Sequence, residues 1–192
     1  AVPIAAAAQE SDTPEPATEA LRPGDVIRVQ IWREETLSGD FPVSPDGVVV
    51  LPKIGRYDVT QDPPETLRRR FIEDFRRYLR NPSIEITFLR RITILGAVRE
   101  AGLQLVDPTM TVADALALAG GTTPDGKTNS IHVIRNGERI QTVNDQMRIT
   151  ETPLRSGDQL FVPERSWPSR NPGIVAAVIS GVVSIAIALL AR

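Results

Sequence analysis

The sequence predicts an α+β fold followed by a single C-terminal transmembrane helix. Short segments with alternating apolar residues, separated by turn residues, are typical of β-strands. Residues 62–80 carry apolar side chains every four positions, which is typical of an amphipathic helix. Residues 174–191 contain no charge, proline or side-chain amide. As a helix this segment would be roughly 27 Å long, within the range of membrane-spanning candidates.

The composition narrows the classes of function. The chain has 192 residues, a net charge of −2, no cysteine and one histidine. The charge indicates no nucleic-acid partner, and the absence of cysteine excludes disulfides and thiol nucleophiles. His132 lies in a strand pattern, where a structural role is expected. We therefore expect no metal, no cofactor and no catalytic residues.

The chain divides into a body with a segment on each side. Residues 1–20 are mostly Ala, Glu, Asp, Thr and Pro, a composition that predicts a flexible leader or the remnant of a signal peptide. Residues 21–165 are long enough for one domain or two small ones. Prolines make residues 166–173 a stiff linker before the predicted transmembrane helix at 174–191.

The first half of the body predicts strands at residues 26–32, 41–43, 48–51 and 83–88. Ser44-Pro45-Asp46-Gly47 predicts a hairpin turn between the second and third of these strands. The helix between the third and fourth strands is expected to open at Asp62, with Pro63 at its first helical position and Glu65 completing a capping box. Asn81-Pro82 ends the helix.

The second half predicts strands at residues 92–95, 131–134 and 138–143, and an apolar segment at residues 159–162. Thr111, with Asp114 three residues later, is expected to cap a short helix that ends at Gly120-Gly121. Asn136-Gly137 predicts a tight hairpin. Leu154-Arg155-Ser156-Gly157-Asp158 repeats the pattern of residues 21–25, Leu-Arg-Pro-Gly-Asp, and we interpret the similarity as shared turn chemistry rather than as a repeat array.

Arginines cover the outer face of the first predicted helix. Arg68, Arg69 and Arg76 are candidates for contact with an acidic polymer or with another subunit, because guanidinium groups pair well with carboxylates. The alternative is a solvated face with no partner.

The predicted transmembrane helix carries a stripe of small residues. Such residues let helix backbones approach closely, so they predict packing against copies of the same helix or the wall of a pore. The alternative is an ordinary anchor. The residues assigned to helix packing or a pore are Ala176, Ala177, Ser180, Gly181, Ser184 and Ala188.

Two stretches resemble known families. Leu21 to Val29, Asp46 to Gly55 and Asn81 to Ile86, with the helix between the last two, resemble the polysaccharide biosynthesis/export domain. Gly96 to Gly102 and Thr111 to Gly121 resemble the SLBB domain, a β-grasp module that usually follows it. The resemblance implies an export domain at residues 21–90 and an SLBB domain at residues 91–165.

The resemblance implies a ring-forming subunit that exports capsular or extracellular polysaccharide across the outer membrane. It also implies a periplasmic body and, as partners, the polysaccharide, an inner-membrane polysaccharide co-polymerase and membrane lipid. The sequence departs from the family pattern in lacking an acylated N-terminal cysteine, in having one SLBB-like unit, and in the low polarity of the tail helix. Two other readings stay open: a singly anchored periplasmic glycan-binding module, and a scaffold subunit of a larger envelope complex. Insertion of the tail into the inner membrane is the alternative location.

Overall fold

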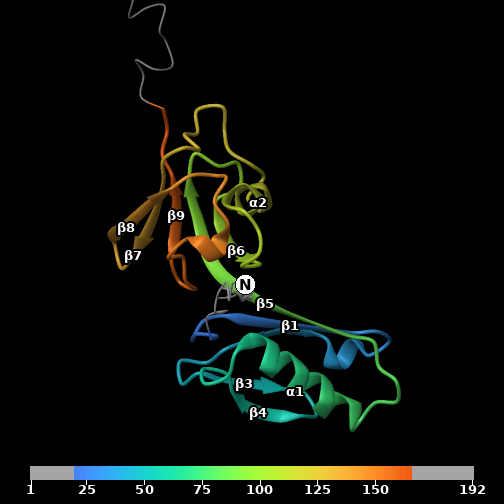
Figure 1. The fold of residues 1–192 in the computed structure, drawn as a ribbon. Coiled ribbons are helices and arrows are strands. Elements are labelled where there is room, and N and C mark those ends of the chain that lie inside the picture. Colours follow the sequence, from blue (N-terminus) through green and yellow to red (C-terminus); the bar gives the residue numbers. More distant parts are fainter. Residues whose placement is uncertain (1–19, 166–192) are drawn as a thin grey trace, which may run out of the picture.

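The computed structural model describes residues 20–165, which form two lobes joined by one long strand (Figure 1). The elements in chain order are β1 (Val26–Ile31), η1 (Glu35–Leu37), β2 (Gly39–Pro42), β3 (Val48–Leu51), β4 (Gly55–Asp58), α1 (Pro64–Arg76), β5 (Ile84–Gly96), β6 (Gly102–Val106), α2 (Val112–Leu118), β7 (Ile131–Arg135), β8 (Glu138–Val143), η2 (Ile149–Glu151) and β9 (Gln159–Val162). A seven-stranded mixed sheet has the order β2-β1-β5-β9-β7-β8, with β6 also paired to β5. Strands β3 and β4 form a separate hairpin.

Strand β5 belongs to both lobes. Its first half, up to Leu89, pairs with β1 in antiparallel orientation, and Thr93 to Gly96 pair with β9 in parallel orientation. The backbone of Ser83 is hydrogen-bonded to Trp32, directly after β1. The backbones of Arg91 and Thr93 are hydrogen-bonded to Gly157 and Asp158, directly before β9. Because alternate residues of a strand point their backbone groups to one edge, β1 and β9 lie end to end along one edge of β5. Strand β6 pairs with residues 90–94 on the opposite edge.

The sequence predicted two strands where β5 is continuous. The prediction was wrong because Leu89-Arg90-Arg91 interrupts the alternation of apolar residues. The structure keeps these residues in the sheet. The backbone N–H of Arg91 donates to the Ser156 hydroxyl at 2.8 Å, and its carbonyl accepts from Gly157 N–H at 2.8 Å.

Helix α1 covers the sheet in the N-terminal lobe, which comprises β1 to α1 and the first half of β5. Leu67, Phe71 and Phe75 are fully buried, in one apolar cluster with residues of β1, β3, β4 and β5. The predicted cap is wrong: Pro63 is the residue before the helix, and no side chain caps it. Asp62 instead lies 3.6 Å from the Arg70 guanidinium.

The turn at residues 44–47 was predicted to join two paired strands, β2 and β3, and this pairing is wrong. Strand β2 pairs with β1, and β3 pairs with β4, which the sequence did not predict. The turn itself is present, because Gly47 N–H donates to the carbonyl of Ser44 at 2.9 Å. The sequence of a turn therefore does not determine which strands pair with each other.

The C-terminal lobe, comprising the second half of β5 and all later elements, has a second apolar cluster built on Ile92 and Ile94 of β5. The predicted cap of α2 is confirmed: Asp114 N–H donates to Thr111 Oγ1 at 3.1 Å, and Thr111 N–H donates to the Asp114 carboxylate at 2.9 Å. Asn136-Gly137 turns the β7–β8 hairpin with φ of +52° and +82°. Strand β6 was not predicted.

The fold class expected from the sequence included a transmembrane helix, and this expectation is corrected. Within residues 20–165 no helix has the length and apolarity needed to cross a membrane. This part of the chain has one mixed sheet, one separate antiparallel hairpin and two α-helices, of 13 and 7 residues. The segment 174–191, with the small residues assigned to packing or a pore, lies outside the described residues.

Candidate functional site at the joint between the lobes

Two turns with the same sequence pattern precede β1 and β9. In the first, Asp25 accepts a hydrogen bond from the backbone N–H of Arg22 at 2.8 Å. In the second, Asp158 accepts from the backbone N–H of Arg155 at 2.7 Å. The glycine before each aspartate has a φ of +92°, in the left-handed region that favours glycine. The similarity seen in the sequence is therefore one turn geometry used twice.

The two turns meet at the middle of β5. The hydroxyl of Ser156, in the second turn, donates to Asp25 Oδ1 in the first at 2.5 Å. A Cβ atom on Gly24 would lie 3.4 Å from Cβ of Ser156, so the turns are in van der Waals contact. They meet because β1 and β9 both start at the centre of β5 and run away from each other.

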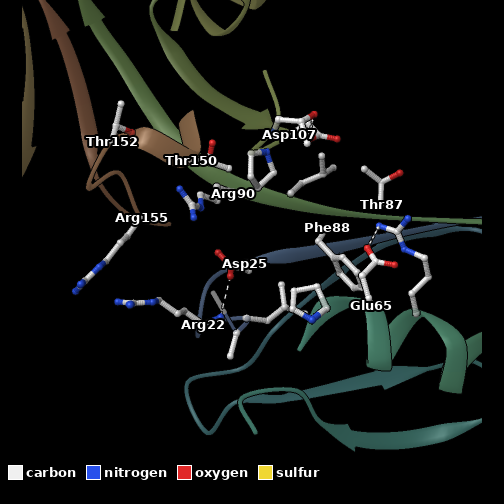
Figure 2. A pocket seen from close by; sticks show the side chains of 17 residues that line it. Arg22, Asp25, Glu65, Thr87, Phe88, Arg90, Asp107, Thr150, Thr152 and Arg155 are labelled. Atoms are coloured by element: carbon white, nitrogen blue, oxygen red, sulfur yellow. Dashed lines mark hydrogen bonds and ion pairs between the residues drawn. The ribbon is translucent and has the colours of Figure 1, made fainter. Parts of the chain in front are cut away.

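A cavity of about 430 Å³ lies beside this joint (Figure 2). Its volume is in the range of small-molecule sites. The lining comes from both lobes: the first turn, α1, β5, the loops around Asp107 and Thr150, and the second turn. The lining residues are Ala20, Leu21, Arg22, Asp25, Pro64, Glu65, Arg68, Thr87, Phe88, Leu89, Arg90, Asp107, Pro108, Thr109, Thr150, Thr152 and Arg155.

Three arginines crowd one end of the cavity. The pKa of Arg22 is lowered by burial first, and then by the positive charges of Arg155 and Arg90. Burial is also the main cause of the lowered pKa of Arg90, whose Nη1 donates to the Leu154 carbonyl at 2.9 Å. Figure 2 shows Arg22 and Arg155 extending on the same side, with Arg90 and Asp25 further in. For both arginines burial is the main cause of the lowered pKa, and the charge of Asp25 acts in the opposite direction.

Nearby carboxylates are engaged in holding the turns. Arg135 donates from Nε and Nη2 to the two carboxylate oxygens of Asp158 at 2.8 and 2.7 Å, and this pairing raises the pKa of Arg135. Asp158 is buried. In contrast, the Arg155 side chain makes no hydrogen bond or ion pair within residues 20–165.

The three arginines named from the sequence do not form one group. Arg68 lines the cavity, 5.4 Å from the centre of the Phe88 ring and 3.5 Å from the Glu65 carboxylate. Its Nε is buried and has no hydrogen-bond partner in the described part of the chain. Arg69 and Arg76 are exposed on α1 and do not line the cavity. Because they are seven residues apart, they share another face of the helix.

Sequence reasoning missed Arg22, Arg90 and Arg155 as site residues. The available signal was the repeated Leu-Arg-x-Gly-Asp pattern, which contains two of the three arginines. Nothing in the sequence indicated that the two turns meet. Among the described residues, no group of three or more side chains is arranged to hold a metal ion.

Comparison with known families identifies the class of protein. Residues 13–89 match the model of the polysaccharide biosynthesis/export protein, and residues 91–144 match the SLBB domain. The chain therefore contains matches to these two domains, in the order that the sequence motifs indicated. The family of the first domain is a class of export and transport proteins rather than an enzyme class.

Two relatives are polysialic acid transport proteins named KpsD, both from Escherichia coli. They are 26% and 25% identical to this chain over 127 residues. Each match covers 64% of this chain and 23% of the relative. The chain therefore spans about a quarter of the length of these relatives.

Proposed function

We propose that the chain is a subunit of a homo-oligomeric ring that exports capsular or extracellular polysaccharide across the outer membrane. Its body lies in the periplasm and docks on an inner-membrane polysaccharide co-polymerase. The observation that carries this proposal is the match to an export domain followed directly by an SLBB domain. The boundary we infer, near residue 90, falls inside the continuous strand β5.

The joint between the lobes supports the role of this chain as a repeated subunit of a ring. One strand runs through both lobes, and the Ser156–Asp25 hydrogen bond ties the turns that flank it. A ring of head-to-tail subunits closes only if each subunit has a defined shape. A joint held by a shared sheet keeps the angle between the lobes constant from one subunit to the next.

Exposed apolar side chains supply candidate subunit contacts. Trp32, at the end of β1, is 74% exposed, and Leu103 of β6 is 60% exposed. Large aromatic residues are frequent energetic centres of protein interfaces. Export itself then requires no bond chemistry: the subunits enclose a lumen through which the polymer passes.

Arg69 and Arg76 are assigned to the wall of this lumen or to the neighbouring subunit. Neither forms an ion pair within residues 20–165, so both can meet carboxylates from outside the chain. Contact with a moving polymer must be weak and repeated, because tight binding would stop its passage. Exposed arginines in water satisfy this requirement.

The experiment is to purify the full chain from membranes and image the particle by negative-stain electron microscopy. The proposal requires a ring with a central opening. A monodisperse monomer would overturn it. If that monomer bound a saccharide, the glycan-binding module would replace the ring, and a fixed ratio of unrelated subunits would instead indicate a scaffold.

A further inference from the structure

We propose that neighbouring subunits meet through two different faces of the N-terminal lobe. The outer face of α1 in one copy docks on the uncovered sheet face around Trp32 in the next copy. The inference rests on the ring proposed above and deepens it by naming the two surfaces that join. It is argued from the place of each surface on the lobe, from their charges and from the exposure of Trp32.

The sheet of the N-terminal lobe has one covered face and one uncovered face. Val29 and Ile31 of β1 are buried in the apolar cluster that contains α1. Because side chains alternate along a strand, Gln30 and Trp32 point to the opposite face. Both are exposed, and so is Glu85 of β5, which is paired with Gln30. This face of the sheet is therefore open to a partner.

An open groove of about 530 Å³ lies along the uncovered face, and Trp32 is 74% exposed in it. The lining residues are Gln30, Ile31, Trp32, Arg33, Glu35, Ser38, Ser83, Ile84 and Glu85. Two carboxylates and one guanidinium leave the groove one negative charge. None of these three groups forms an ion pair or a side-chain hydrogen bond within residues 20–165. The groove therefore favours a partner with arginines, which pair with carboxylates and stack on tryptophan.

The outer face of α1 presents such arginines. Arg69, Glu73 and Arg76 are spaced by four and three residues, so they share one face of the helix. This face is turned away from the buried side chains of Leu67 and Phe71. The three charged residues, which we call the α1 stripe, are exposed and form no ion pair in the described part of the chain. The stripe has two positive charges and one negative, the reverse of the groove.

The α1 stripe and the Trp32 groove lie on different sides of the lobe. Figure 1 shows α1 together with β3 and β4 on one side of β1, and the apolar face of α1 is turned toward the sheet. Two different surfaces that fit each other join copies head to tail, which is the contact that builds a ring. An acidic polymer fits the groove less well, because its carboxylates would meet Glu35 and Glu85.

The test is charge reversal in the purified full chain, with assembly followed by analytical ultracentrifugation and negative-stain electron microscopy. The stripe variant is Arg69→Glu/Arg76→Glu, and the groove variant is Glu35→Arg/Glu85→Arg. Each should lose the ring, because each brings like charges together across the contact. A one-to-one mixture should restore particles that contain both variants, because opposite charges then meet at every contact.

The matched control is Arg99→Glu/Arg139→Glu, the same change of charge on two exposed arginines of the other lobe. This control should assemble as the wild type does. Trp32→Ala should weaken the contact about thirtyfold, as measured from the concentration dependence of assembly, which is the loss typical of an interface hot spot. Circular dichroism melting identifies any variant that fails to fold.

Three results would refute this contact and leave the ring standing: a ring formed by either folded reversal variant, a mixture that does not assemble, or wild-type assembly of Trp32→Ala. Normal rings with reduced export in the stripe variant would assign the arginines to the polymer instead. If the wild type formed open filaments and the reversal variants did not, the contact would stand and the closed ring would be refuted. A wild-type monomer would refute both.

Discussion

The hydroxyl of Ser156 donates a hydrogen bond to the carboxylate of Asp25 although the two residues are 131 positions apart. The same hydroxyl accepts from the backbone N–H of Arg91 at 2.8 Å. One side chain thus connects the turn before β1, the turn before β9 and the middle of β5. The joint between the lobes depends on this contact.

Ser156→Ala should lower the stability of the protein. It leaves the Arg91 N–H and one oxygen of Asp25 without this partner, and each loss of this kind costs on the order of 1–3 kcal/mol. Urea unfolding followed by circular dichroism measures the change. Ser83→Ala, an exposed serine with no side-chain hydrogen bond in the described residues, is the control. Equal stability of the two variants would show that the joint does not depend on Ser156.

Gly96→Ala should be much more damaging than Gly121→Ala. Both glycines have positive φ, +92° and +82°, so each variant carries the strain of a left-handed residue, roughly 1–2 kcal/mol. At Gly96 a Cβ would also lie 2.1 Å from the carbonyl oxygen of Val162, whereas nothing lies within 4 Å at Gly121. The expected result is loss of folded protein for Gly96→Ala and a modest decrease in melting temperature for Gly121→Ala. Similar melting temperatures would mean that β9 moves easily away from β5.

Tyr57→Phe should destabilise the protein by about 1 kcal/mol, the net value of a typical hydrogen bond. The Tyr57 hydroxyl donates to Asp74 at 2.6 Å, while Tyr78 is exposed and its hydroxyl has no such bond within residues 20–165. Tyr78→Phe is therefore the control, with no expected change. The comparison fails if both variants unfold at the same urea concentration.

The same tyrosine predicts a dependence on alkaline pH. Burial, helped by the hydrogen bond to Asp74, raises the pKa of Tyr57 from 10.0 to about 12. The folded state therefore favours the neutral phenol, and this stabilisation is present below pH 10 and is lost as the pH rises toward 12. Melting temperatures between pH 9 and 12 should fall less steeply for Tyr57→Phe than for the wild type. If the melting temperatures of the two proteins fell equally with pH, the raised pKa of Tyr57 would be refuted.

Acid should weaken the pairing of β1 with β2. The Arg28 guanidinium donates to the Asp40 carboxylate at 2.7 and 2.8 Å, and this hydrogen bonding lowers the pKa of Asp40. A carboxyl with a lowered pKa stabilises the folded state above its ordinary pKa, and this stabilisation is lost as the pH falls through the folded-state value. Asp40→Asn should flatten the decline of melting temperature below pH 4, by a small amount because the pair is partly exposed. Arg28→Gln should produce the same flattening, and an unchanged slope in both variants would refute the linkage.

The double variant Arg69→Gln/Arg76→Gln tests the exposed face of α1. Stability should change by less than about 0.5 kcal/mol, as for surface residues without special contacts. Export of polysaccharide by cells carrying the variant should fall if these arginines meet polymer or a neighbouring subunit. Arg56→Gln controls for the loss of a surface charge. Normal export by the double variant would identify the face as solvated.

The sequence predicted most elements that depend on local patterns. The apolar face of α1, the Thr111–Asp114 cap and the Asn136-Gly137 turn were confirmed because short-range geometry determines each of them. Strands β4 and β6 were not predicted, since Gly55–Asp58 and Gly102–Val106 show no clear alternation. These two segments are strands because β4 pairs with β3 and β6 pairs with β5.

The sequence alone indicated the two domains and their order along the chain. Two motifs in a fixed order are a linear property of the chain, and the family comparison confirmed them. The sequence also pointed to Arg68, although for the helix face rather than for a cavity.

Only the tertiary structure decided that β5 is one strand and that β1 and β9 start at its centre. This arrangement brings Asp25 and Ser156 together across 131 positions of sequence. Sequence patterns report which residues share a face of one element, because side chains repeat every two or 3.6 residues. They carry no such signal for the pairing of distant strands, so the joint and its cavity became visible only in the folded chain.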